Sequence, residues 1–113
     1  MGRTIKPQRI KRELGLSNQD FLKFKQICRD AQRIWRNEHP QSKWANIKTP
    51  WGLIPEPEIE QVVQLVWNKG VERNIFRAGG DNSYIKRMAI QDRLQAIRQN
   101  WYNNHRRKAE KLM

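Results

Sequence analysis

The chain has almost no cysteine and no long apolar run. Cys28 is the only cysteine among 113 residues, so no internal disulfide forms and the composition does not fit a secreted disulfide scaffold. No apolar stretch is long enough to span a membrane, and the segment after Met1 lacks the apolar run of a signal peptide. We therefore expect an intracellular protein, nuclear or nucleoid-associated, with no membrane partner.

Residues that carry catalysis or bind metals are also scarce. The two histidines, His39 and His105, are isolated, and no group of Cys and His has the spacing of metal ligands. There is no glycine-rich phosphate loop. The alternating Glu56, Glu58 and Glu60 are placed where they complement the positive end of a helix dipole. We therefore expect no enzyme activity, no catalytic residues, no cofactor and no metal site.

Acidic residues are few compared with basic ones. The chain has 23 Lys and Arg against 11 Asp and Glu, which gives a net charge of +12. Most of the excess lies in residues 1–16 and 83–113, whereas residues 40–82 contain equal numbers of each sign. A compact domain with this charge repels itself, and such a basic composition is typical of nucleic-acid-binding proteins.

Ser17 followed three residues later by Asp20 is typical of a helix start. Beyond it, apolar residues recur at spacings of three and four, which predicts an amphipathic helix to about Glu38, before Pro40. The predicted buried stripe consists of Phe21, Phe24, Cys28, Ala31 and Trp35.

Proline density excludes regular structure between this helix and the next one. Residues 40–57 contain Pro40, Pro50, Pro55 and Pro57. Pro57 then suits the first turn of a second helix, which either ends at Gly70 or continues through residue 75. Its predicted buried face is formed by Ile59, Val62, Val63, Val66 and Trp67.

From Tyr84 to about Lys111 there is neither proline nor glycine, which predicts one long helix. Its predicted core stripe is Ile90, Leu94, Ile97 and Trp101.

These elements together predict an all-α fold: a compact domain of three to four helices, with a Trp/Pro-rich loop between the first two long helices and a long basic C-terminal helix. Residues 17–113 form the single helical domain, and residues 1–16 form a basic arm or a short helix. A second apolar group on the last helix leaves a dimer open.

One face of the long helix carries side chains that pair with base edges in DNA. Arginine and glutamine bind bases bidentately, and tyrosine contacts phosphate or stacks. The alternative is an ordinary solvated face of good helix formers. The row consists of Arg87, Gln91, Gln95, Arg98 and Tyr102, and Arg106 extends it by one turn.

Basic residues at both ends of the chain are candidates for phosphate contacts. Arg106, Arg107 and Lys108 exceed what is needed to complement the helix dipole, which is the alternative explanation. Basic arms also enter the minor groove or follow the phosphates, although a solubilising tail or a nuclear-import signal fits equally well. The N-terminal candidates are Arg3, Lys6, Arg9, Lys11 and Arg12.

Two further groups have both a structural and a functional interpretation. A ridge opposite the aromatic stripe of the first long helix is either a solvated face or a phosphate-binding one; it contains Lys25, Arg29, Arg33 and Arg36. Three tryptophans, Trp35, Trp67 and Trp101, lie in apolar stripes and are assigned to the core. Exposed aromatics stack on bases or dock partners, and the candidates for this role are Lys43, Trp44 and Trp51.

Together these patterns predict a nucleic-acid-binding module. Double-stranded DNA is the expected ligand, bound by the basic C-terminal helix and the N-terminal arm, with a role in transcription regulation. The alternatives are an RNA-binding or ribonucleoprotein component, and a protein-interaction module that binds its partner with the Trp44–Pro57 loop.

Overall fold

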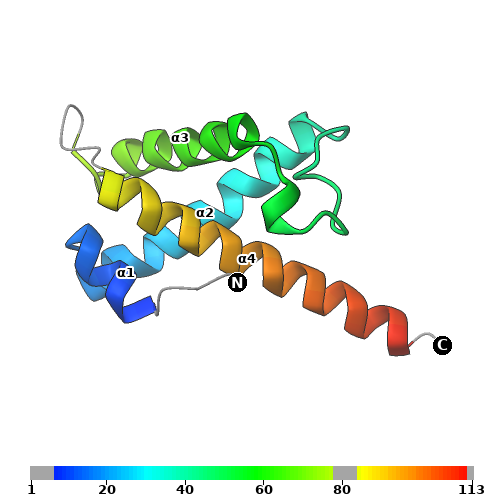
Figure 1. Cartoon of the computed structure of the whole chain (residues 1–113). Helices are drawn as coiled ribbons and strands as arrows, with labels where there is room; N and C mark the ends of the chain where they lie inside the picture. Colours follow the sequence, from blue (N-terminus) through cyan, green and yellow to red (C-terminus); the bar gives the residue numbers. More distant parts are fainter. Residues whose placement is uncertain (1–6, 78–83, 112–113) are drawn as a thin grey trace.

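A computed structural model of the chain describes residues 7–77 and 84–111. In these two ranges all regular structure is helical, which confirms the predicted all-α class with a long C-terminal helix (Figure 1). The elements are α1 (Pro7–Leu14), α2 (Asn18–Glu38), the short 3-10 helix η1 (Trp51–Leu53), α3 (Glu56–Glu72) and α4 (Tyr84–Lys111).

The ends of α2 are set by local hydrogen bonds. The Ser17 hydroxyl oxygen accepts a hydrogen bond from the Asp20 backbone N–H at 3.1 Å, which confirms the predicted cap. At the other end the His39 N–H donates to the Trp35 carbonyl, and Pro40 follows. All five residues of the predicted stripe are buried, so this helix is positioned by its apolar face.

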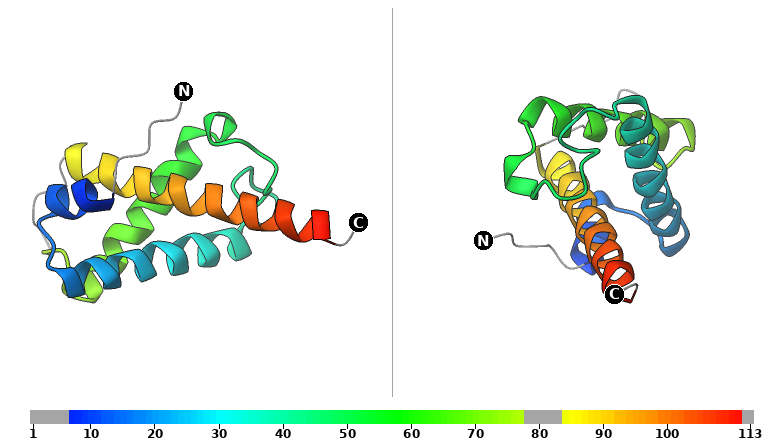
Figure 2. Two further views of the ribbon diagram at one scale, coloured as in Figure 1. Left: turned by 90° about the horizontal axis from the view of Figure 1, so that it is seen from below. Right: turned by 90° about the vertical axis from the view of Figure 1, so that its right-hand side faces the viewer.

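Residues 7–14 of the basic N-terminal segment form the packed helix α1. Gly15 ends it in the left-handed region, with φ at +66°, and the Leu16 N–H then donates to the Lys11 carbonyl. Ile10 and Leu14 are buried in the common core. Helix α1 lies against the first part of α4 (Figure 2).

The core lies where α2, α3 and α4 meet. Helix α2 packs against both α3 and α4, which also touch each other. Trp67 of α3 stacks on Phe76 with their ring centroids 4.5 Å apart, and Phe24 of α2 meets Phe76 edge-on. Fully buried aliphatic side chains from all three helices fill the space between them, including Ile27, Val62, Val63, Val66, Ile90 and Leu94.

Gly70 lies inside α3, which continues to Glu72. After the helix, Asn74 adopts a φ of +62°, and the N–H groups of Ile75 and Phe76 donate to the Gly70 carbonyl. This turn folds Phe76 back over Gly70, so that a Cβ on Gly70 would lie 2.2 Å from the Phe76 ring. Gly70 is therefore required for close packing and does not stop the helix.

Gly70→Ala is expected to lower the free energy of unfolding by about 1–2 kcal/mol, because overpacking outweighs the gain in helix propensity. Gly52→Ala is the matched control, since a Cβ there meets nothing within 4 Å, and it should change stability by less than about 0.5 kcal/mol. Urea denaturation followed by circular dichroism measures both. Equal shifts in the two midpoints would contradict the packing role of Gly70.

Candidate nucleic-acid interface

The C-terminal part of α4 extends beyond the helical domain. The last core residue of α4 is Ile97, Trp101 is half-buried, and every residue from Asn104 to Lys111 is exposed. Figures 1 and 2 show this end of the helix projecting away from the other elements. We call residues 104–111 the projecting end.

The projecting end is strongly basic. It contains Arg106, Arg107, Lys108 and Lys111 against a single acid, Glu110. The Arg106 Nε lies 3.9 Å from a Glu110 carboxylate oxygen, and both side chains are more than 60% exposed (63% and 69%), so this ion pair is weak. Most of the positive charge here is therefore accessible to a ligand.

Arg98 is not available as a base-reading residue, which corrects the prediction for this position. The residue is only 6% exposed. Its Nη2 donates to the carbonyl oxygens of Trp44 at 2.9 Å, Asn46 at 2.6 Å and Lys43 at 3.3 Å, and its Nη1 donates to that of Thr49. Arg98 therefore holds the loop that follows α2 against α4.

The rest of the predicted row does not form a continuous accessible face. Arg87 pairs with Glu60 of α3, and Gln91 is half-buried. Gln95 is also half-buried, and Tyr102 is 37% exposed. The first part of the row is turned toward α3 and the loop, so accessible positions begin only near Tyr102.

Trp44 is fully buried, so the prediction of an exposed aromatic at this position is wrong. Its exposed fraction is 0%, and its indole N–H donates to the Gln32 side-chain oxygen at 3.4 Å. Its backbone N–H donates to a Glu58 carboxylate oxygen at 2.9 Å. The loop folds back across α2, and Trp44 meets Trp35 and Trp51 edge-on, with ring centroids 6.4 and 5.5 Å away.

This burial changes the interpretation of the Trp/Pro-rich loop. Lys43 is exposed, but its neighbour Trp44 belongs to the core. Trp51 is half-buried and lies at the edge of a cavity. The loop therefore offers no fully exposed tryptophan to a protein partner at residues 44 and 51.

The cavity lies between the loop and the exposed side of α4, just before the projecting end. Its volume is about 290 Å3. Side chains from both segments form its wall: Ile47, Lys48, Thr49, Pro50 and Trp51 from the loop, and Gln95, Arg98, Gln99 and Tyr102 from α4. Trp51, Gln95 and Tyr102 are candidates from the sequence, and the cavity brings them together with Gln99, which the sequence pattern did not indicate.

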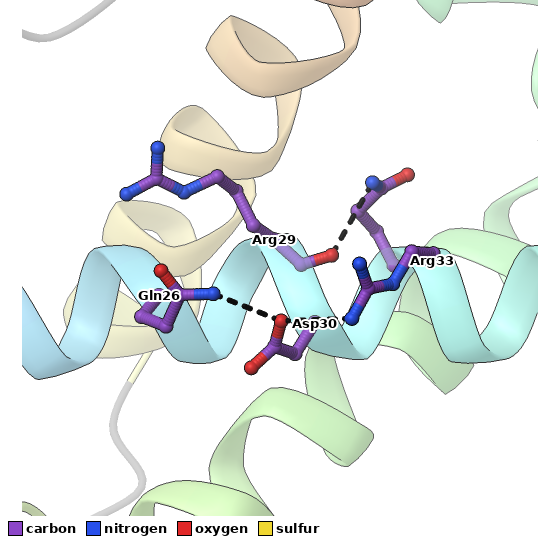
Figure 3. A network of polar contacts seen from close by, with 5 residues as sticks. Gln26, Arg29, Asp30 and Arg33 are labelled. Carbon is purple, nitrogen blue, oxygen red and sulfur yellow. Dashed lines mark hydrogen bonds and ion pairs between the residues drawn. The ribbon is translucent and has the colours of Figure 1, made fainter.

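The basic ridge of α2 is only partly accessible. Asp30 accepts hydrogen bonds from Gln26 at 3.0 Å and from Arg33 at 3.3 Å. In Figure 3 the exposed Arg29 side chain points away from this network. The Lys25 ammonium lies 5.1 Å from the Phe21 ring centroid. The Arg29 guanidinium is therefore exposed and lies outside the Asp30 network.

Arginines of α2 and α4 lie close enough to repel one another. Burial lowers the pKa of Arg93, and the charge of Arg29 lowers it further. Burial likewise lowers the pKa of Arg36, with a further effect of Arg33, and the pKa of Arg98, with a further effect of Arg36. Because arginine keeps its charge in proteins, this side of the molecule carries several positive charges close together, partly offset near Arg98 by Glu58, and a bound anion would reduce their repulsion.

Trp101 links the two helices at this side. The Arg36 guanidinium lies 4.2 Å from the Trp101 ring centroid, within the range of a cation–π contact. Trp101 is half-buried and lies outside the core cluster, so its assignment to the core is wrong, whereas Trp35 and Trp67 are buried as predicted.

The N-terminal candidates are divided by the structure. Arg3 and Lys6 lie outside the described residues, and Arg9 lies in α1. The Lys11 ammonium donates to the Asn18 side-chain oxygen, whereas Arg12 is exposed. Helix α1 thus contributes Arg12 to the surface.

Within residues 7–77 and 84–111, no three His, Cys, Asp or Glu side chains lie together as a metal site would require. Cys28 is buried, and burial raises the pKa of its thiol.

None of the helices within residues 7–77 and 84–111 is long and apolar enough to cross a membrane. The chain matches no protein-family model, no curated protein and no solved structure.

Proposed function

We propose that this chain is a nucleic-acid-binding domain that holds the phosphates of double-stranded DNA with the projecting end of α4. The observation that carries the proposal is the exposure of every residue from 104 to 111, together with the charge of Arg106, Arg107, Lys108 and Lys111. These residues contribute nothing to the core, so core packing does not explain their length or composition.

A helix without a buried face gains little stability of its own. The projecting end is therefore marginal as an isolated segment, and a ligand that contacts its side chains would stabilise it. A helix is about 10–12 Å wide with its side chains, and the B-DNA major groove, about 12 Å wide, admits it. The deep major groove of A-form RNA is too narrow for it, which favours DNA.

Exposed arginines outside α4 extend the proposed phosphate-binding surface. Arg29 of α2 is exposed and lies near Arg93 of α4, and Arg12 of α1 is exposed. Arg3 and Lys6 precede α1 in the sequence and belong to the same proposal. Because Arg98 is occupied by the loop carbonyls, we propose contacts mainly to phosphates, which position a protein without reading sequence.

The test compares two triple variants with the same net charge. Arg106→Gln, Arg107→Gln and Lys108→Gln together are expected to weaken binding to a duplex at least about tenfold at 0.1 M salt, because three phosphate contacts are lost. Lys23→Gln, Arg73→Gln and Arg77→Gln remove three exposed cations from other elements and are expected to have a much smaller effect. Fluorescence anisotropy measures both affinities, and circular dichroism checks the fold.

Equal losses in the two triple variants would show that only net charge matters and would overturn the proposed interface. Absence of duplex binding by the unaltered chain at low salt would overturn the proposed function itself. The affinities for single-stranded DNA and for structured RNA are measured at the same salt concentration. Tighter binding to either would overturn the preference for duplex DNA.

A further inference from the structure

The cavity beside α4 has a wall suited to a planar ring. Trp51 comes from the loop and Tyr102 from α4, so two aromatic side chains from segments far apart in sequence line one space. Aromatic side chains bind nucleobases by stacking, because every base has a π-face. A wall of this kind selects flat aromatic ligands over flexible aliphatic ones.

The polar groups of the cavity are those that bind the edge of a base. Gln95 and Gln99 line it, and each side-chain amide presents both a donor and an acceptor. Arg98 lines it as well, but its guanidinium donates to the loop carbonyls, so the two glutamine amides are the groups available to the edge of a base.

The volume and position of the cavity limit the ligand further. At about 290 Å3 it is at the lower end of the range for small-ligand pockets, which suits one base and not a stacked pair. Tyr102 precedes Arg106 by four residues, about 6 Å along the helix axis. A strand whose phosphates contact the projecting end therefore passes the cavity mouth, where Lys48 is exposed.

We propose that this cavity binds the base of an unpaired nucleotide in the DNA that the projecting end holds. This inference rests on the proposed function and refines it. The domain then prefers DNA in which one nucleotide lies outside the duplex stack, because such a base enters the cavity without first breaking a base pair. Phosphate contacts supply the general affinity, and the cavity supplies the preference for the unpaired nucleotide.

The experiment uses the full chain and two DNA duplexes that differ at one position. In one duplex a single 2-aminopurine nucleotide is bulged out, and in the other it is paired with thymine. We expect about tenfold tighter binding to the bulged duplex, which is the effect of one stacked base. We also expect 2-aminopurine fluorescence to be quenched on binding, because the base stacks on aromatic rings.

Tyr102→Ala is expected to lose this tenfold preference while its affinity for the paired duplex stays unchanged. Gln99→Ala, at an exposed position, is the second variant and should reduce the preference without affecting the fold. Tyr84→Ala is the matched control, because Tyr84 lies on the same helix, is 76% exposed and does not line the cavity. This control should keep the full preference.

Equal affinity for the two duplexes, or unchanged 2-aminopurine fluorescence, would overturn the inference and leave the proposed function standing. Absence of binding to both duplexes would overturn both proposals. Adenosine monophosphate is tested in parallel as a free source of the same base. If it binds more tightly than the bulged duplex and Tyr102→Ala abolishes its binding, the ligand is a free nucleotide and the inference is overturned.

Discussion

Replacing Arg98 with alanine is expected to lower the free energy of unfolding by about 3–5 kcal/mol, because several hydrogen bonds from a charged donor are lost and each contributes about 1.5–3 kcal/mol. Arg98 donates to four backbone carbonyls in residues 43–49. Without the guanidinium these acceptors lose their donor, and buried polar groups without partners are costly. The loop would then detach from α4.

Urea denaturation followed by circular dichroism measures this effect. Arg98→Lys is a second variant that keeps the charge, but a single ammonium cannot reproduce the planar fork, so we expect only partial recovery. Arg106→Ala, on the projecting end, is the control and should change stability by less than about 0.5 kcal/mol. If Arg98→Ala left stability unchanged and altered base preference instead, the structural role of Arg98 would be refuted.

Trp44→Ala is also expected to destabilise the fold strongly, by about 3–5 kcal/mol, as is typical of large-to-small substitutions of buried aromatic residues. The side chain is fully buried between α2 and the loop, and its removal leaves a cavity next to Trp35 and Trp51. The Gln32 side-chain oxygen also loses the hydrogen bond that it accepts from the indole N–H of Trp44.

Far-ultraviolet circular dichroism is the suitable readout for Trp44→Ala, because the other tryptophans dominate the fluorescence. Trp44→Phe keeps most of the apolar volume and should destabilise the fold less than alanine does. Leu53→Ala, in the same segment and 70% exposed, should have little effect. A Trp44→Ala protein of normal stability that failed to bind DNA would indicate a stacking residue and contradict its place in the core.

The helices were predictable because their signals are local. Apolar spacing and the Ser17 cap predict α2 to within one residue at its start, and α2 ends at Glu38 as expected. The absence of proline and glycine predicts α4 from Tyr84 to Lys111. Each signal depends on residues within one or two turns of the position it describes, so a single sequence is sufficient to detect it.

The site was less predictable because its contacts join distant segments. Arg98 has the same helical spacing as its surface neighbours Gln95 and Tyr102, and nothing near it in sequence indicates four carbonyls from a loop about fifty residues earlier. Trp44 follows Lys43 in a proline-rich segment without helical spacing, which suggests exposure. The groups that satisfy its N–H donors, Gln32 and Glu58, come from two different helices, and this arrangement exists only in the folded chain.

The most direct test of the central claim is a salt titration of duplex-DNA binding by the unaltered chain and by the triple variant at residues 106–108. Counterion release predicts a linear fall of log affinity with log salt, with a slope of about −0.9 for each phosphate contacted. We predict that the variant has a shallower slope, by about 2–3 units, because three phosphate contacts are lost. Identical slopes for the two proteins would contradict the claim that the projecting end of α4 holds the DNA backbone.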